Sequence, residues 1–203
     1  YQPSTEEKKF IDVIGDFLEI SKLSQFYYTI ARVFNELYHY SYALSLVKLA
    51  IKEFETHEIE EDNSHVTKRQ YYSLYFQIAL GLQNFHEAFM ALQQLDTNSQ
   101  NYSDFKEANN LRYADLKQFV DSIIVSNDLK NLITYPFSPG DMTKVDEILY
   151  DNADSINFNF PLSASLTVIN TSLATGLKHF KTVYSWRLNN GDVRGACEAL
   201  YQY

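Results

Sequence analysis

Apolar residues recur at helical spacing along most of the chain. The first such stretch sets four large apolar side chains on one helix face: Phe10, Ile14, Phe17 and Leu18. Ser4 and Glu7 lie just before them as a capping box, which is typical of a helix N-terminus. Comparable stripes occupy residues 26–37, 43–54, 72–82, 85–95, 119–124, 142–149 and 169–188. No segment shows the sustained alternation of a strand, so the pattern predicts an all-α fold of roughly ten helices.

Three of the predicted helix turns share one plan. Each has a leucine that ends a helix, a short polar turn and a helix that opens with a small residue, at 37–46, 82–91 and 188–199. The small residues are Ala43, Ala88 and Ala196, and the gap from leucine to alanine is longer in the third copy. Small side chains let antiparallel helices approach closely just past a tight turn. The copies predict stacked antiparallel hairpins in an irregular α-solenoid, with chance similarity of three turns as the alternative.

The predicted helices form one α-helical domain across residues 1–203. We expect sub-blocks at about 1–60, 65–153 and 163–203. An acidic stretch at 53–62 and an irregular stretch at 151–165 separate them. The chain opens on Tyr1 rather than on methionine, so we interpret it as a piece of a longer protein.

Composition narrows the classes of protein to which the chain can belong. Its 6 glycines and 4 prolines in 203 residues favour long helices with short connections. The net charge of −9 lacks the basic footprint of a nucleic-acid-binding protein. Cys197 is the one cysteine, which excludes an internal disulfide and fits a reducing compartment, the cytosol or the nucleus. We expect its thiol to be buried on a packed helix.

No motif predicts catalysis or a cofactor. The glycines are scattered, so no loop is suited to cradle a phosphate, and no nucleophile elbow frames a serine. His86 and Glu87 begin a near match to the zinc-protease helix, but Met90 stands where the second histidine ligand is required. We therefore expect a surface histidine and a chain that is no enzyme, with no metal, cofactor or small-molecule substrate.

Two clusters could bind a partner. The first is a basic, aromatic-rich hairpin whose candidate interface residues are Phe180, Tyr184, Trp186, Arg187, Arg194, Tyr201 and Tyr203. Such a face fits an acidic protein surface or nucleic acid, and the alternative is a solvated flank beside a core stripe. A solenoid end needs a polar outer face or a cover, and we expect this end to be covered, either by later residues of the full-length chain or by another protein. The second cluster is Tyr71, Tyr72, Tyr75 and Phe76, which we expect to pack against two layers of the fold rather than a partner.

Three stretches, at 74–95, 116–150 and 180–203, carry a resemblance to a known family. The last stretch matches a pattern of the family at a short turn. Trp186 and Arg187 precede the turn, and Arg194 and Ala196 follow it. An aromatic–proline–aromatic break after a short helix is matched at 135–137. In this order, the elements resemble the C-terminal α-helical region of the 120/160-kilodalton scaffold nucleoporin, from the Y-shaped outer-ring subcomplex of the nuclear pore. The resemblance covers roughly half of the chain.

The resemblance implies a structural scaffold of the nuclear pore coat, with no catalysis and no cofactor. It implies an upstream β-propeller, a location at the nuclear envelope, and a role in nuclear transport and messenger RNA export. The implied partners are other α-helical nucleoporins at the hub of the Y, with no direct nucleic acid and with the membrane reached only through the coat. The alternative is the helical scaffold of a vesicle coat or a tetratricopeptide-like adaptor, although the ~34-residue period of such an adaptor is absent.

Overall fold

The computed structural model describes residues 23–57, 64–97, 105–126, 128–154 and 166–201. These ranges contain nine helices and no strand, which confirms the predicted all-α class. Their bounds are α2 Leu23–Glu36, α3 Tyr40–His57, α4 Ser64–Gly81, α5 Phe85–Thr97, α6 Phe105–Ser126, α7 Leu129–Leu132, α8 Pro139–Asp154, α9 Leu166–Asn189 and α10 Val193–Tyr201. The number is one below the roughly ten predicted, and the first predicted helix, at 10–18, lies outside the described residues.

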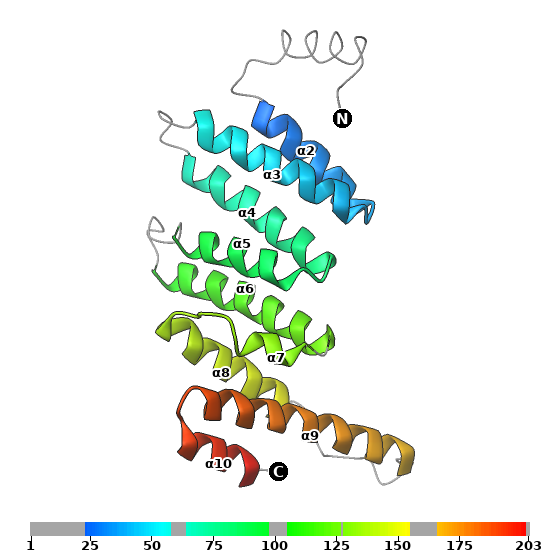
Figure 1. Ribbon diagram of the computed structural model, residues 1–203, viewed down its shortest axis with the longest axis vertical. Helices are drawn as coiled ribbons and strands as arrows, with labels where there is room; N and C mark the ends of the chain where they lie inside the picture. Colours follow the sequence, from blue (N-terminus) through cyan, green and yellow to red (C-terminus); the bar gives the residue numbers. More distant parts are fainter. Residues whose placement is uncertain (1–22, 58–63, 98–104, 127, 155–165, 202–203) are drawn as a thin grey trace. The chain divides into compact units, whose positions relative to one another are not determined.

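The chain divides into two compact units, Tyr1–Asn109 and Asn110–Tyr203. In the first unit, α2, α3, α4 and α5 pack in chain order, each against the next (Figure 1). The core between them mixes small and large apolar side chains: Ala43, Val47, Ala50, Phe76, Ile78, Ala79, Ala88 and Leu92. Small residues opposite large ones let the helices pack closely without voids.

The tyrosine-rich side of α4 packs inside the first unit. The Tyr71 ring lies edge-on to Tyr28 of α2, with 4.9 Å between ring centroids, and 5.1 Å from the Phe54 ring of α3. Its hydroxyl donates a hydrogen bond to the Ser24 hydroxyl at 3.2 Å, so its one polar atom is satisfied although the residue is buried. Tyr71 therefore contacts two neighbouring helices, as the sequence predicts for this cluster.

In the second unit, α8, α9 and α10 pack in chain order, and polar contacts join α6 to α8. Tyr113 of α6 donates to Asp151 at 3.3 Å, and Lys117 donates to Asn152 at 3.5 Å. The core of this unit includes apolar side chains from three helices and from the segment before α8: Phe119, Val120, Ile123, Phe137, Val145, Ile148, Leu149, Phe180, Val183 and Trp186.

Both ends of α8 differ from the sequence prediction. The sequence predicts a break across 135–140, whereas α8 begins at Pro139, because the first helical position needs no backbone N–H. The Ser138 hydroxyl accepts a hydrogen bond from the Asp141 amide at 3.2 Å and so caps the helix. At the other end α8 runs to Asp154 with Ala153 buried, so the irregular stretch expected from residue 151 is wrong up to that point.

Three helix hairpins turn through the same backbone geometry. Each turn holds one residue in the left-handed region: Tyr38 (φ 59°), Gln83 (φ 55°) and Gly191 (φ 81°). In each, the amide of the following residue donates to the carbonyl five residues back, at 2.9 Å. These bonds form the Schellman motif, which satisfies the last carbonyl groups of the helix that ends there.

The three small residues predicted from the sequence occupy equivalent positions after these turns. Ala43, Ala88 and Ala196 are fully buried, and each amide makes the first bond of its helix, to the carbonyl four residues back, at 3.1, 3.0 and 2.9 Å. The predicted hairpin plan is therefore confirmed. The spacing from the left-handed residue to the buried alanine is the same in all three copies. The spacing from leucine to alanine is longer in the third copy because α9 continues past Leu188 before the chain turns.

Enlarging the buried alanines should destabilise the chain. We expect Ala88→Leu and Ala196→Leu each to lower the free energy of unfolding by about 1–3 kcal/mol, because no room remains at these helix contacts. Urea unfolding followed by circular dichroism measures the loss. Ser185→Leu adds bulk at an exposed position of α9 and is the control. Unchanged stability in both alanine variants would show that the close approach is not needed.

Candidate protein-interaction surface

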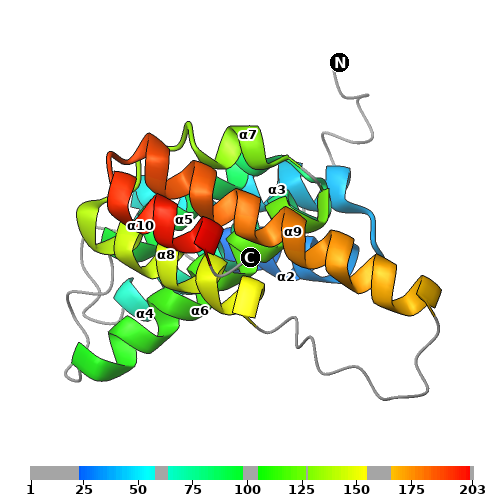
Figure 2. The same cartoon turned by 90° about the horizontal axis from the view of Figure 1, so that it is seen from below.

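The last helix, α10, has a small-residue inner side and an apolar outer side. Its inner side packs against α9 through buried Gly195, Ala196 and Ala199, and Figure 2 shows the two helices together. Its outer side carries exposed side chains at helical spacing: Val193, Cys197, Leu200 and Tyr201. We call these four residues the α10 outer face. Tyr201 is 92% exposed, so the face ends on an aromatic side chain in full contact with solvent.

Polar contacts hold α10 in place at its N-terminus. The Asp192 carboxylate accepts a hydrogen bond from the Gly195 amide at 2.9 Å, which caps the helix. A Cβ atom at position 195 would collide with that carboxylate, so a larger residue there would displace the cap. Arg187 of α9 donates to the Gly195 carbonyl at 3.1 Å and to both carboxylate oxygens of Asp146 at 2.8 and 2.7 Å. The outer face is therefore presented from a fixed backbone.

The positive charge of Arg187 stabilises the position of α10. Its hydrogen bonds with Asp146 raise the pKa of the guanidinium above its usual value, although partial burial opposes the shift. The guanidinium also lies over the Tyr150 ring, 5.5 Å from its centroid. This residue thus links α8, α9 and α10, and its cation is directed at its own unit rather than outward.

The structure separates the residues that the sequence groups as one interface. Phe180 and Trp186 belong to the core of the second unit, and the Trp186 ring packs on Phe137 at 5.8 Å between centroids. Tyr184 is partly exposed, while Arg194 is exposed and pairs with Glu198 at 3.1 Å. Of the other candidates, Arg187 is described above, Tyr201 lies on the α10 outer face, and Tyr203 lies outside the described residues.

Three members of the α10 outer face are missing from the sequence prediction. Val193 and Leu200 are not among the candidate interface residues of the sequence, and Cys197, which the sequence predicts to be buried, is exposed. The available signal is the placement of Ala196 and Ala199: their small side chains mark the packed side, so the residues between them must point outward. The predicted stripe on α9 is also shifted, because Val183 is buried and Leu188 is exposed.

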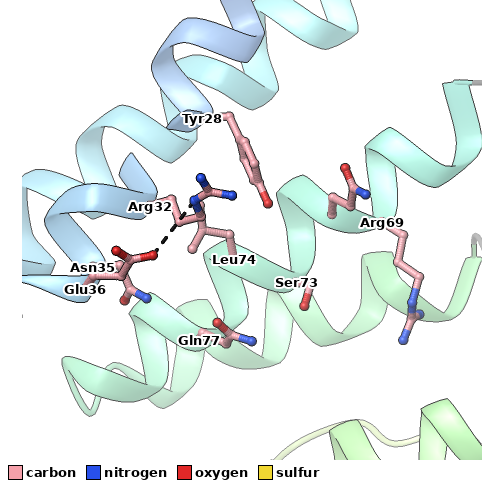
Figure 3. A pocket seen from close by; sticks show the side chains of 9 residues that line it. Tyr28, Arg32, Asn35, Glu36, Arg69, Ser73, Leu74 and Gln77 are labelled. Carbon is pink, nitrogen blue, oxygen red and sulfur yellow. Dashed lines mark ion pairs between the residues drawn. The ribbon is translucent and has the colours of Figure 1, made fainter. Parts of the chain in front are cut away.

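A groove of about 520 Å³ with a mixed polar and apolar lining lies between α2 and α4 in the first unit (Figure 3). Two guanidinium groups line it: Arg32 lies 3.9 Å from Glu36, and Arg69 donates to the Leu95 carbonyl at 3.4 Å. Tyr28, Leu74 and the uncharged polar residues Asn35, Gln70, Ser73 and Gln77 complete the lining.

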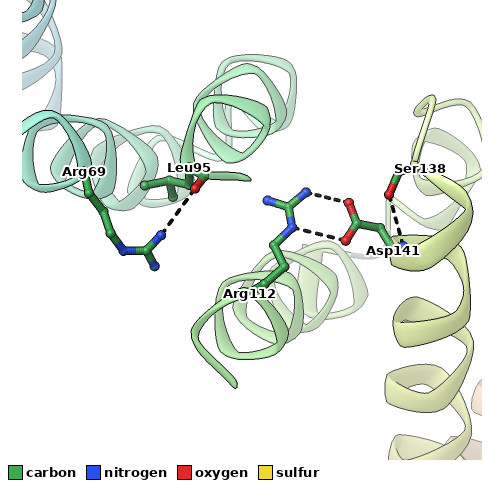
Figure 4. Close-up of polar contacts among 5 residues, drawn as sticks. All are labelled: Arg69, Leu95, Arg112, Ser138 and Asp141. Atoms are coloured by element: carbon green, nitrogen blue, oxygen red, sulfur yellow. Dashed lines mark hydrogen bonds and ion pairs between the residues drawn. The ribbon is translucent and has the colours of Figure 1, made fainter. Parts of the chain in front are cut away.

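Two buried charged side chains of the second unit, Arg112 and Asp141, form an ion pair (Figure 4). Arg112 donates from Nε and Nη2 to the two carboxylate oxygens of Asp141, at 3.1 and 2.6 Å. Burial alone raises the pKa of the Asp141 carboxyl, but the hydrogen bonds and charge of Arg112 outweigh burial and hold that pKa below its usual value. The pair joins α6 to α8 and lies within the packed interior, so we assign it to stability.

Other features that could signal chemistry are accounted for by packing. His86 is exposed, as expected, and Glu87 pairs with Lys48 at 2.9 Å. Burial, followed by the charge of Lys178, lowers the pKa of His179. Among the described residues, no group of three or more His, Cys, Asp or Glu side chains could hold a metal ion. The described helices also include none whose length and hydropathy suit a membrane crossing.

Comparison with known proteins settles the family. A family model described as nucleoporin Nup120, HEAT repeats, matches residues 2–123, which is more than half of the chain. The chain belongs to the Nup120 nucleoporin family. It is also 26% identical over 180 residues to nucleoporin NUP120 of Chaetomium thermophilum. No solved structure matches the chain.

Membership of the Nup120 family confirms the resemblance found in the sequence and the α-solenoid class, because the matching model consists of HEAT repeats. It assigns the chain to a scaffold nucleoporin of the nuclear pore complex, at the nuclear envelope. The alignment covers 89% of this chain but only 12% of the Chaetomium protein. The chain therefore spans a small part of the length of its relative.

Proposed function

We propose that this chain is a non-catalytic binding module of the nuclear pore coat, which joins other α-helical nucleoporins at the hub of the Y-shaped subcomplex. The observation that carries the proposal is the α10 outer face, an apolar stripe on a helix whose inner side is fully packed. Through this assembly role the protein supports nuclear transport and messenger RNA export.

The mechanism is geometric. Packed helices hold the α10 outer face in a fixed orientation, so a partner helix can bury it without first ordering it. Val193, Leu200 and Tyr201 supply apolar area, and tyrosine is one of the residue types enriched in interface hot spots. Arg194 and Glu198 flank the stripe and form a polar rim. The proposal needs no catalytic group and no cofactor.

A charge placed on the α10 outer face should weaken assembly. We expect Val193→Glu in the full-length protein to reduce its affinity for other nucleoporins by about tenfold or more, because an interface must then bury an unpaired carboxylate. Glutamate is well tolerated in the first turn of a helix, so α10 itself should remain folded. Quantitative mass spectrometry of the purified complex, with nuclear-rim fluorescence, measures the effect.

Val125→Glu is the matched control, because Val125 is also exposed, at 86%, and the substitution is the same. We expect the complex purified with this variant to contain every nucleoporin in the same amount as the complex purified with the unmodified protein. Equal recovery with both variants would reject the α10 outer face as the binding surface. Loss of all pore association with the Val125 variant alone would assign the surface to α6 instead.

A further inference from the structure

The groove between α2 and α4 has the length of a short extended peptide. Helix α3 packs against both α2 and α4, so these two helices form the walls of the groove. The lining runs from Tyr28 to Glu36 on α2 and from Arg69 to Gln77 on α4 (Figure 3). Each wall therefore extends for about 12 Å along its helix axis. An extended chain covers that length with about four residues.

The walls carry side chains that can pair with a peptide backbone. Asn35 on α2 and Gln70 and Gln77 on α4 each offer an amide oxygen as acceptor and an amide NH₂ group as donor. No side chain in the described part of the chain bonds to these three amides. An extended peptide needs partners for its own N–H and C=O groups, and side-chain amides supply both kinds. Tyr28 and Leu74 add apolar surface for one side chain of such a peptide.

The Arg32 guanidinium on the α2 wall is accessible to a carboxylate. Its side chain is 58% exposed, and the distance from its Nε to Glu36 Oε1 is 3.9 Å, which is too long for a hydrogen bond. Exposed ion pairs of this kind contribute little to stability, so an incoming carboxylate displaces Glu36 at small cost. A guanidinium binds a carboxylate most strongly through two parallel hydrogen bonds, and the contact with Glu36 makes neither of them.

We propose that this groove binds an extended segment of another protein, in which an aspartate or glutamate lies next to an apolar residue. The carboxylate pairs with Arg32, the apolar side chain packs on Tyr28 and Leu74, and the wall amides bond to the backbone. Two arginines and one glutamate leave the lining with one net positive charge, which fits a single carboxylate rather than the polyanion of a nucleic acid. The groove lies in the first unit, so the inference is independent of the function proposed above.

A charge swap read out by crosslinking tests this proposal. A photoreactive phenylalanine replaces Gln77, an exposed residue of the lining, in the full-length protein within cells, and mass spectrometry identifies the crosslinked peptide. We expect a segment of another protein with an acidic residue within about four positions of the crosslink. Arg32→Glu should lower the yield of this crosslink about tenfold or more, because two carboxylates then face each other. Replacing the partner's acidic residue with arginine should restore the yield.

Lys52→Glu is the matched control, because Lys52 is an exposed cation of α3 outside the groove lining. This variant should crosslink as strongly as the unmodified protein. Arg32→Gln should also lower the yield, and it keeps the test decisive if Arg32→Glu unfolds, since it removes the cation without adding repulsion from Glu36. Circular dichroism of the purified variants identifies the folded ones.

Three results would overturn the assignment of the groove to an acidic segment. The first is equal crosslink yield from the Arg32 and Lys52 variants. The second is a loss in Arg32→Glu that the arginine in the partner does not reverse. The third is the absence of a crosslink to an acidic segment of another protein, whether position 77 reaches RNA, this same chain or nothing at all.

Discussion

Replacing Arg112 with methionine should lower the free energy of unfolding of the second unit by about 3–5 kcal/mol, which is among the largest effects expected in this chain. The guanidinium and the Asp141 carboxylate are both buried, and the two hydrogen bonds between them satisfy the ion pair. Removing the cation leaves a carboxylate that must either remain charged in an apolar interior or bind a proton. Both outcomes cost free energy.

A double variant separates charge from packing. Arg112→Met with Asp141→Leu removes both charges and keeps apolar volume, so we expect it to recover most of the lost stability. Urea unfolding of the single and double variants gives the comparison. A single variant as stable as the unmodified chain would show that the ion pair is not buried in solution.

The same ion pair predicts a pH dependence. Because Arg112 holds the folded-state pKa of Asp141 below its usual value, the stabilisation is fully present above the usual aspartate pKa and is lost as the pH falls through the lower, folded-state pKa. Asp141→Asn removes this titrating group. The difference in unfolding free energy between the unmodified chain and this variant should therefore shrink on acidification.

Trp186→Ala should destabilise the second unit by about 3–5 kcal/mol, the usual cost of emptying a large buried aromatic site. The Trp186 side chain is only 4% exposed and packs edge-on against Phe137, which in turn contacts Phe119 of α6 at 6.3 Å between centroids. One substitution thus opens a cavity where α9 meets the segment before α8. Thermal and urea unfolding measure the loss.

Tyr201→Ala is the control for the tryptophan, because Tyr201 is an aromatic residue of the same hairpin that lies almost wholly in solvent. We expect its effect on stability to stay within about 0.5 kcal/mol. If the Trp186 variant were as stable as the Tyr201 variant, Trp186 would not be a core residue. The two aromatics would then belong to one surface, as the sequence alone predicts.

The helical class and the hairpin plan could be predicted from the sequence because both depend on local rules. Apolar spacing of three and four residues indicates the helices, and the small residues after the turns, Ala88 and Ala196 among them, indicate where helices approach closely. The turn geometry was less accessible. Tyr38 and Gln83 adopt a left-handed conformation usually taken by glycine or asparagine, so residue type gives no warning at these two positions.

The candidate interface could be predicted only in part, because burial depends on contacts between distant segments. Trp186 and Tyr201 have the same signature in sequence, an aromatic residue near arginine. Phe137, which lies about fifty residues before Trp186, is what makes the first a core residue. Cys197 shows the opposite error: a thiol is usually buried, but this one falls between the two alanines that face α9 and therefore points outward.

Photo-crosslinking from position 201 tests the central claim, that the α10 outer face binds other nucleoporins, most directly. A photoreactive phenylalanine replaces Tyr201 in the full-length protein within cells, and mass spectrometry identifies the crosslinked peptides, with position 125 as the control. The account predicts crosslinks from position 201 to a helical segment of another nucleoporin, and none to that segment from position 125. If the photoreactive group at position 201 forms no crosslink in intact pores, or crosslinks only to this same chain, the result would contradict the claim that the α10 outer face binds other nucleoporins.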